Sequence, residues 1–434
     1  MKRLRAALLA LPLVLLLAAL AAVALAWPRP RFIPAASPAA YAPTPQNVAR
    51  GAYLARAGNC IACHTARAGA AYAGGRALDT PFGRFYGPNL TPDAETGIGS
   101  WSADDFWNAL HNGIAKDGRL LYPAFPYTNY TRVTRADADA LYAYFRSLAP
   151  QRQPNRPHEL DFPYNRQLLL AGWRLLYFRP GDLSPQPARS AQWNRGAYLV
   201  EGLGHCSACH SARNALGASK DGLEGGLEGG LNSTLGWYAP SLTASGEAGL
   251  GDWDEAHIVA LLGTGISPRG SATGPMAEVV ARSLQYLTPE DLGAMAAYLK
   301  SLPATPAPAL APRAARTPPA SEQVLQEGRR IYAGQCAQCH GGDGKGKLPA
   351  YPPLAGNRAV TLTPAVNAIR MTVNGGFPPA TRGNPRPYGM PPFGHELSDA
   401  QVAAVLSWIR ASWGNAAPPV SAADVNRYRA ITSD

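Results

Sequence analysis

The spacing of apolar residues predicts a helix in three well-separated stretches, 137–148, 289–302 and 398–412. In the last stretch Val402, Val405 and Ile409 recur every three or four positions, which places them on one helical face. Ser398 directly precedes this pattern, and Thr288 precedes the pattern at 289–302. Serine and threonine are suited to cap a helix N-terminus. Each helix is therefore expected to pack one apolar face on a core.

A second helix is predicted upstream of each of the three, and the chain repeats itself there. Gly51-Ala-Tyr-Leu recurs as Gly196-Ala-Tyr-Leu, and Gly328 begins a related stretch. The first two copies also match further on, because Pro88-x-Leu-Thr and Trp101 recur 152 residues later as Pro240-x-Leu-Thr and Trp253. The third copy keeps only a Pro-Pro-Leu at 352–354. Such internal similarity indicates three repeated units.

The predicted fold is all-α: three tandem domains with loop-rich connections, the loops favoured by 44 glycines and 41 prolines. The expected divisions are a signal peptide or membrane-anchor helix at 1–27, a first repeat at 46–150, a connector at 151–190, a second repeat at 191–303, a Pro-rich linker at 304–320, a third repeat at 321–415 and a C-terminal tail at 416–434.

The N-terminus is basic and then apolar. Lys2, Arg3 and Arg5 precede an uncharged run from Ala6 to Trp27. This run has the features of a cleaved signal peptide, and it is also long enough to span a bilayer. Both alternatives stay open. Both place residues 28–434 on the periplasmic side of a bacterial inner membrane, because the positive end stays in the cytoplasm.

The connector contains the apolar stretch Leu168–Phe178. Such a stretch could dock on a partner subunit or lie at a membrane surface. The favoured interpretation is that it covers a seam between neighbouring domains.

The formal net charge of +11 has no concentrated origin outside the N-terminus. No basic stripe with interleaved aromatic residues is present, which argues against nucleic-acid binding. Attraction to anionic lipids is an alternative to a simply solvated surface.

All six cysteines fall into three Cys-x-x-Cys-His motifs, the signature of covalent c-type haem attachment. Two cysteines on one helical turn can form thioethers to one haem, and the next histidine can reach the iron. A shared zinc site would leave the histidines unexplained, a thioredoxin-like pair needs a βαβ context, and a disulfide framework suits shorter chains. The expected cofactor-binding residues are Cys60, Cys63, His64, Cys206, Cys209, His210, Cys336, Cys339 and His340.

Methionine sulfur is the usual sixth ligand of an electron-transfer haem. Met276 follows Gly-Pro, Met390 precedes Pro-Pro-Phe, and each stands before the last helix of its repeat. Both are predicted iron ligands, whereas Met295 and Met371 are expected to pack in the core. The first repeat has no methionine, and the position equivalent to Met276 falls near Ala124-Phe125. His111 is the nearest alternative donor, although a packing role is favoured for it.

Together these motifs resemble the tri-haem cytochrome c subunit of membrane-bound periplasmic dehydrogenases, and the three tandem domains are expected to be of the class I cytochrome c type. The resemblance covers 46–415 and includes Leu-Tyr-Pro-Ala-x-Pro-Tyr at 121–127, Gly-Pro-Met at 274–276 and Gly-Met-Pro-Pro-Phe at 389–393. It implies a catalytic partner that is a quinoprotein, flavoprotein or molybdenum hydroxylase, with electrons passing through three haems to ubiquinone or a terminal oxidase. Phe125 departs from the family pattern, which commonly has methionine there.

The function expected from the sequence is electron transfer, without catalysis by the chain alone, since no general base, nucleophile or substrate pocket can be named. One alternative is a peroxidase-like enzyme acting at an open first haem. Another is a free periplasmic electron carrier. The sequence does not select the partner dehydrogenase or its substrate.

Overall fold

The computed structural model describes residues 37–219, 226–232, 235–243, 247–305 and 318–429, together with Val14 and Leu17. The predicted segment 1–27, apart from those two residues, and most of the linker 304–320 lie outside the described residues. The chain forms two compact units. The first comprises Met1–Ala52 and His64–Leu183, and the second comprises Tyr53–Cys63 and Ser184–Asp434.

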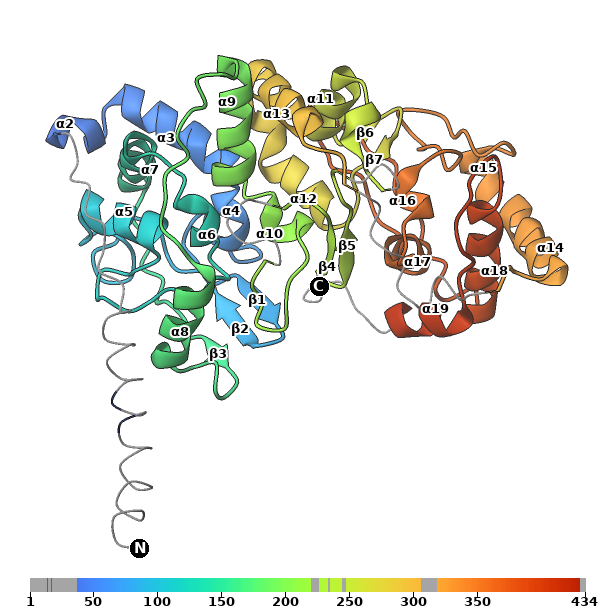
Figure 1. Cartoon of the computed structure of the whole chain (residues 1–434), viewed down its shortest axis with the longest axis horizontal. Helices are drawn as coiled ribbons and strands as arrows, with labels where there is room; N and C mark the ends of the chain where they lie inside the picture. Colours follow the sequence, from blue (N-terminus) through green and yellow to red (C-terminus); the bar gives the residue numbers. More distant parts are fainter. Residues whose placement is uncertain are drawn as a thin grey trace, which may run out of the picture. The chain divides into compact units, whose positions relative to one another are not determined.

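Helices make up most of the regular structure (Figure 1). Helix α3 (Pro45–Ala57) begins in the first unit and ends in the second. The other helices of the first unit are α2 (Pro38–Tyr41), α5 (Ala103–Asn112), α6 (Tyr127–Tyr130), α7 (Arg135–Arg146) and α8 (Gln167–Tyr177). Those of the second are α4 (Cys60–Cys63), α9 (Ala191–Ala197), α10 (Ser207–His210), α11 (Glu255–Thr264), α12 (Pro275–Arg282), α13 (Pro289–Ser301), α14 (Glu322–Ile331), α15 (Ala337–His340), α16 (Arg358–Thr361), α17 (Val366–Asn374), α18 (Asp399–Arg410) and α19 (Ala422–Arg429). Two π-helical turns, Tyr198–Leu203 and Tyr332–Cys336, extend α9 and α14, and 3₁₀ turns span Leu250–Asp252 and Leu284–Tyr286.

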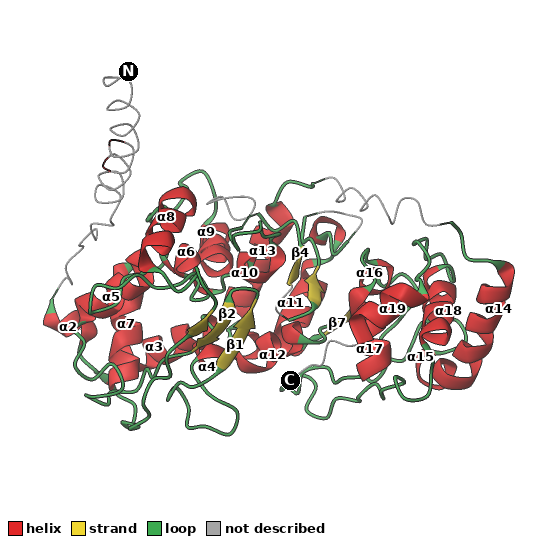
Figure 2. Cartoon of the chain, turned by 90° about the horizontal axis from the view of Figure 1, so that it is seen from below, coloured by secondary structure: helices red, strands yellow, loops and turns green. Residues whose placement is uncertain are grey.

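The all-α prediction missed three small antiparallel sheets, which Figure 2 shows among the helices. In the first sheet, β2 (Gly83–Tyr86) lies between β1 (Ala77–Thr80) and β3 (Glu159–Leu160) and pairs with both. In the other two, β4 (Gly230–Asn232) pairs with β5 (Trp237–Ala239), and β6 (Ile266–Ser267) pairs with β7 (Gly270–Ser271). Their strands have two to four residues. Strands this short carry too little alternation to be recognised in a sequence.

The three helices predicted from apolar spacing are confirmed as α7, α13 and α18. Thr288 caps α13 by accepting from the Asp291 backbone N–H, and Ser398 forms a reciprocal capping box with Gln401. Their apolar faces are buried, and Val402 and Val405 are almost fully covered. At these helices, the local capping signals and the burial of the apolar face in the folded chain therefore favour the same structure.

One helix crossing occurs three times and explains the glycine repeated before each cysteine pair. A Cβ atom on Gly51, Gly196 or Gly328 would overlap the backbone of Ala140, Ala294 or Ala404, respectively, on the final helix of the same repeat. Helix α9 packs on α13, and α14 packs on α18, as Figure 1 shows. The crossing backbones thus approach too closely for any side chain at these glycines.

Replacing Gly196 with alanine is expected to destabilise the second repeat by about 2–3 kcal/mol, because the added methyl group forces α9 away from α13. The midpoint of urea unfolding of the full chain measures this. Gly293→Ala, on the facing helix, is a matched control whose methyl would meet only the flexible end of Gln192, at 3.7 Å. It should be neutral or slightly stabilising. Equal effects of the two substitutions would contradict the close crossing.

The connector contributes α8, whose buried face lies inside the first unit. Leu170 and Ala171 join Ile114 and Leu120 in a small apolar cluster. One face of this stretch therefore packs on the core of its own unit, and its expected place at a seam between domains stays a prediction. At the other end of the chain, α19 lies within the predicted tail and packs on α17 and α18, burying Val425.

Candidate haem sites

Each Cys-x-x-Cys-His motif lies on a single turn of helix. These turns are α4, α10 and α15; α4 contains both of its cysteines, whereas Cys206 and Cys336 are the N-cap residues of α10 and α15. In each motif the two cysteines stand three positions apart, which makes them neighbours on one helical face. Cys60 and Cys63 bound α4, and His64 follows directly, whereas His210 and His340 end their turns. The predicted cysteine and histidine residues are thus arranged locally as thioether formation and axial ligation require.

A proline carbonyl holds the histidine of each motif. Nδ1 of His64, His210 and His340 donates to the carbonyl oxygen of Pro88, Pro240 and Pro352, at 2.7, 2.8 and 2.9 Å. A carbonyl can only accept, so Nδ1 carries the proton and the Nε2 lone pair is left for a metal. Burial lowers the pKa of each histidine, which favours the neutral, ligating form.

These hydrogen bonds show what the backbone does at the repeated proline positions. The sequence showed that Pro88 and Pro240 correspond and that Pro352 starts the shared Pro-Pro-Leu, but not what they do. A backbone acceptor leaves no side-chain signal in the sequence. The only evidence for it there was the constant 152-residue offset between the first two repeats. On the other side of each histidine, its own carbonyl accepts from the N–H of Gly74, Gly229 or Gly346, all with left-handed backbone.

The cysteines are poorly suited to act as thiolates. Burial raises the pKa of the Cys60 and Cys206 thiols to about 12 and that of Cys336 to about 11. A thiolate is the form that attacks a disulfide, so the raised pKa values disfavour a disulfide-exchange role. A thioether bond to haem, once formed, leaves the cysteine sulfur uncharged.

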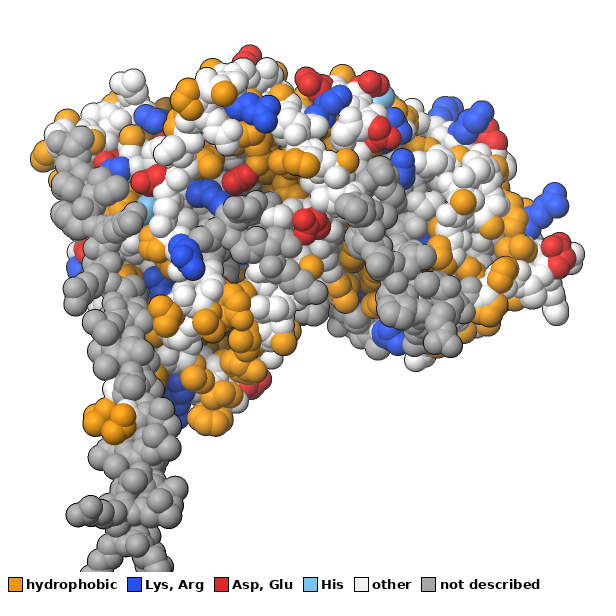
Figure 3. All heavy atoms as spheres, viewed as in Figure 1, with side chains coloured by type: hydrophobic (Ala, Val, Ile, Leu, Met, Phe, Trp, Pro, Cys, Tyr) orange, Lys and Arg blue, Asp and Glu red, His pale blue; other side chains and the backbone are white. Residues whose placement is uncertain are grey.

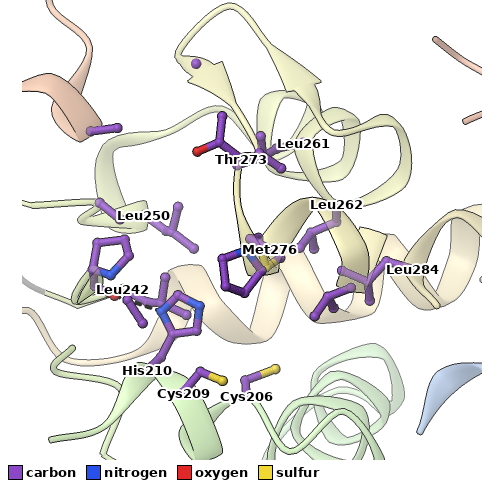
Figure 4. Close-up of a pocket in the computed structure, with 18 of the residues that line it drawn as sticks. Cys206, Cys209, His210, Leu242, Leu250, Leu261, Leu262, Thr273, Met276 and Leu284 are labelled. Carbon is purple, nitrogen blue, oxygen red and sulfur yellow. Dashed lines mark hydrogen bonds between the residues drawn. The ribbon is translucent and has the colours of Figure 1, made fainter. Parts of the chain in front are cut away.

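The second motif opens into an apolar cavity of about 290 Å³ (Figure 4). Cys206 and Cys209 lie at one end of it and Thr273 at the other, with His210 and Met276 directed into the space between. Leucines from several elements form much of the wall: Leu242, Leu250, Leu261, Leu262 and Leu284. This lining, with nitrogen and sulfur donors both present, fits a covalently held haem.

Met276 is positioned by the two residues before it. Pro275 starts α12, where its fixed φ is compatible with a first helical turn. Gly274 has φ +54°, and a Cβ there would lie 2.8 Å from the Trp237 ring. The backbone conformations of Gly274 and Pro275 therefore place the Met276 side chain at the cavity. Met295, expected to pack, is buried on α13 and also contributes to the cavity wall.

In the third repeat, Met390 is held by its backbone. It exchanges two hydrogen bonds with Gly376, 2.8 and 3.0 Å long, and its side chain packs on the cluster containing Tyr332 and Phe393. The Met371 side chain lies near Gly376, because a Cβ atom added to Gly376 would be 3.4 Å from the sulfur of Met371. The ligand role of Met390 stays a prediction.

In the first repeat, Phe125 packs on a neighbouring aromatic side chain. The Phe125 ring lies 5.3 Å from the Tyr130 ring. His111, the alternative donor, is buried, stacks on Trp107 with centroids 4.2 Å apart, and has Nδ1 3.9 Å from an Asp182 oxygen. This environment suits the packing role favoured for His111, and the sixth ligand of the first iron is not identified by these contacts.

The cavity of the second motif also has neighbours from the other two repeats within the second unit. Ala57 and Asn59, just before Cys60, line one part of it, and α4 packs against α12. Asn357 and Arg358 of the third repeat line another part. The third repeat is fixed there by Asn367, whose amide makes hydrogen bonds of 2.9 and 2.7 Å with the backbone of Tyr238. The second site thus adjoins both neighbouring motif-bearing segments.

Two features are absent from the described part of the chain. No helix there combines the length and apolar character needed to cross a bilayer. No group of three or more His, Cys, Asp and Glu side chains converges there as a metal site.

Comparison with known proteins gives matches across the three repeats. The family model for cytochrome c matches residues 48–149, 194–303 and 325–413. The chain is 40% identical to the cytochrome c subunit of the quinone-type alcohol dehydrogenase of Gluconacetobacter polyoxogenes, over 88% of this chain and 84% of that protein. It is 40% identical to the gluconate 2-dehydrogenase cytochrome c subunit of Pantoea cypripedii, over 88% and 89%. It is 44% identical to a subunit of the nicotinate dehydrogenase of Pseudomonas putida over 90% of this chain, which spans only 32% of that longer protein.

Proposed function

The chain belongs to the cytochrome c family, and we propose from that premise that it is the electron-transfer subunit of a dehydrogenase complex. It binds haem c covalently. Three tandem cytochrome c domains, at 46–150, 191–303 and 321–415, each carry one haem. The catalytic subunit, a quinoprotein, flavoprotein or molybdenum hydroxylase, oxidises the substrate and delivers electrons to them.

The observation that carries this proposal is the threefold recurrence of one arrangement. Three Cys-x-x-Cys turns are each followed by a histidine whose Nδ1 is held by a proline carbonyl. A bound haem supplies reversible one-electron chemistry. The residues attach it, orient the histidine and exclude water, which is the division of labour expected of an electron carrier.

The second haem is proposed as the middle of the relay. Its cavity is lined by Ala57 and Asn59 on one side and by Asn357 and Arg358 on another. Electron transfer through protein is efficient only over short distances, so a cavity adjoining both other motif-bearing segments is well placed to pass electrons between them. Met276 and Met390 serve as sixth ligands of the second and third irons, which raises their potentials and closes them to small molecules.

The proposed location is the periplasmic side of the bacterial inner membrane, where ubiquinone or a terminal oxidase accepts the electrons. The basic and apolar N-terminal sequence supports export in that direction. The named relatives support the partner class, since each is a subunit of a dehydrogenase.

Purification of the tagged full chain from its native membranes tests the proposal. We expect three covalent haems per chain and a co-purifying subunit that contains quinone, flavin or molybdenum cofactor. Substrate of that subunit should reduce the haems in the complex, and the chain purified away from it should not respond. Substrate-dependent reduction by the chain alone would contradict the proposal.

A peroxidase-like activity is the second candidate, favoured by one feature, the presence of Phe125 where the other repeats have a methionine. Peroxide turnover by the purified chain at a rate comparable with substrate-driven electron transfer would support it. A free carrier would instead be recovered from the soluble periplasm without a dehydrogenase subunit.

A further inference from the structure

Helix α8 has its polarity reversed relative to an ordinary surface helix. Its single charged side chain, Arg174, is 4% exposed and donates to the carbonyl oxygens of Asn112 and Gly113. The opposite face presents four leucines, all at least half exposed: Leu168, Leu169, Leu175 and Leu176. Exposing four leucines to water while an arginine is buried is unfavourable. This arrangement indicates that an apolar environment other than water covers the leucine face of α8.

The apolar surface continues beyond the helix. Phe162 is 75% exposed and Tyr164 is 39% exposed, in the loop between β3 and α8. From residue 37 onward, every exposed large hydrophobic side chain described in the first unit lies between Phe162 and Leu176. Figure 3 shows hydrophobic side chains gathered over α8 and this loop. We call residues 162–176 with this outward face the α8 surface.

The composition of the α8 surface and its margins fits a bilayer. Exposed arginines, Arg166 and Arg179, stand at the two ends of the helix, and no acidic residue lies between them. Arginine at the margin of an apolar face can bind phosphate head groups while leucines enter the acyl region. Tyr164, Trp173 and Tyr177 supply the aromatic side chains that favour the membrane interface.

The N-terminal sequence would hold this unit at a bilayer if it is retained as an anchor. The apolar run Ala6–Trp27 belongs to the stretch of chain assigned to the first unit, and α2 begins at Pro38. The ten residues between them can span at most about 35 Å, so a segment held in the membrane keeps the first unit close to it. A protein partner would need no such proximity.

We propose that the α8 surface lies on the phospholipid bilayer, with the leucines in the acyl boundary and Arg166 and Arg179 at the head groups. This inference rests on the proposed function, because it gives the electron-transfer subunit its membrane contact. It commits to lipid as the occupant, and the catalytic subunit or a second copy of this chain are outcomes that would overturn it.

Site-specific photo-cross-linking tests the proposal. All six native cysteines belong to haem motifs, so Leu176→Cys introduces a single reactive thiol that can carry a benzophenone. Val324→Cys, at an exposed aliphatic position on α14, is the matched control. The full chain with its dehydrogenase partner is illuminated in vesicles of phosphatidylethanolamine and phosphatidylglycerol, and adducts are identified by mass spectrometry.

We expect phospholipid adducts at residue 176 to exceed those at residue 324 at least tenfold. A cross-link from residue 176 to the catalytic subunit or to another copy of this chain would overturn the proposal, as would equal lipid labelling at both positions or no adduct at residue 176. Haem staining of the same protein band reports haem attachment separately, so a failure of the lipid contact is distinguishable from a failure of the proposed function.

Discussion

A chain in which Cys206 and Cys209 are both replaced by alanine is expected to contain two covalent haems instead of three. The two thioethers are the only covalent link that the second motif can make, and Cβ alone cannot form them. The haem content per chain, measured as the pyridine haemochrome, should fall by one third. Loss of all three haems, or of none, would contradict the assignment of one haem to each motif.

The structural effect of this substitution should also be large. The cavity at the second motif has a volume of about 290 Å³. At about 24 cal/mol per Å³, leaving such a cavity empty costs roughly 7 kcal/mol, which is comparable with the whole stability of a typical domain. The second repeat is therefore expected to lose its tertiary packing and become sensitive to protease. Asn357 and Arg358 line the same cavity, so the third repeat should be loosened as well.

Ser207→Ala provides the matched control, because Ser207 lies between the same two cysteines without forming a thioether. It should retain three haems and wild-type resistance to protease. If this variant also lost a haem, the effect of the cysteine substitutions would reflect a general disturbance of the turn.

The parts of the fold that depend on short-range patterns could be predicted from the sequence. The final helices were placed within about two residues, since apolar spacing and the caps Thr288 and Ser398 are local signals. The Cys-x-x-Cys-His motifs were equally readable, because their chemistry requires three residue types at fixed spacing. Met276 was recognised by its Gly-Pro context, and the structure directs its side chain into the cavity of its own motif.

Features made by backbone or by long-range contact could not be predicted. The acceptor of His210 is the carbonyl of Pro240, thirty residues away, and any residue provides a carbonyl. The small strands were missed because pairing of two-residue segments depends on the loops around them. The outward face of α8 could not be assigned for a different reason. Apolar residues lie on both sides of this helix, so the sequence gives no signal of which side is buried.

Carbon monoxide is expected to bind one haem of the reduced wild-type protein, the first. Phenylalanine has no lone pair for iron, so Phe125 leaves the first repeat without the methionine that closes the other two sites. Met276→Ala should open the second haem and raise the binding to two equivalents. In Met276→Ala, the midpoint potential of the second haem should also fall by on the order of 100 mV or more, because the iron ligands set haem potentials over a range of about 0.8 V. The shift of the Soret band on titration with carbon monoxide measures the first effect, and potentiometric titration the second.

Phe125→Met is the converse experiment and keeps the size and apolar character of the side chain. Introducing sulfur at this position is expected to abolish carbon monoxide binding and to raise the potential of the first haem, since methionine ligation stabilises the reduced iron. A wild-type protein that binds no carbon monoxide would show that another side chain already occupies the first site. His111→Ala would then test the nearest candidate, and its burial against Trp107 argues that this variant would lose stability before it opened the iron. On the proposal of one haem at each motif, the presence or absence of a methionine ligand determines which of the haems can react with a small molecule.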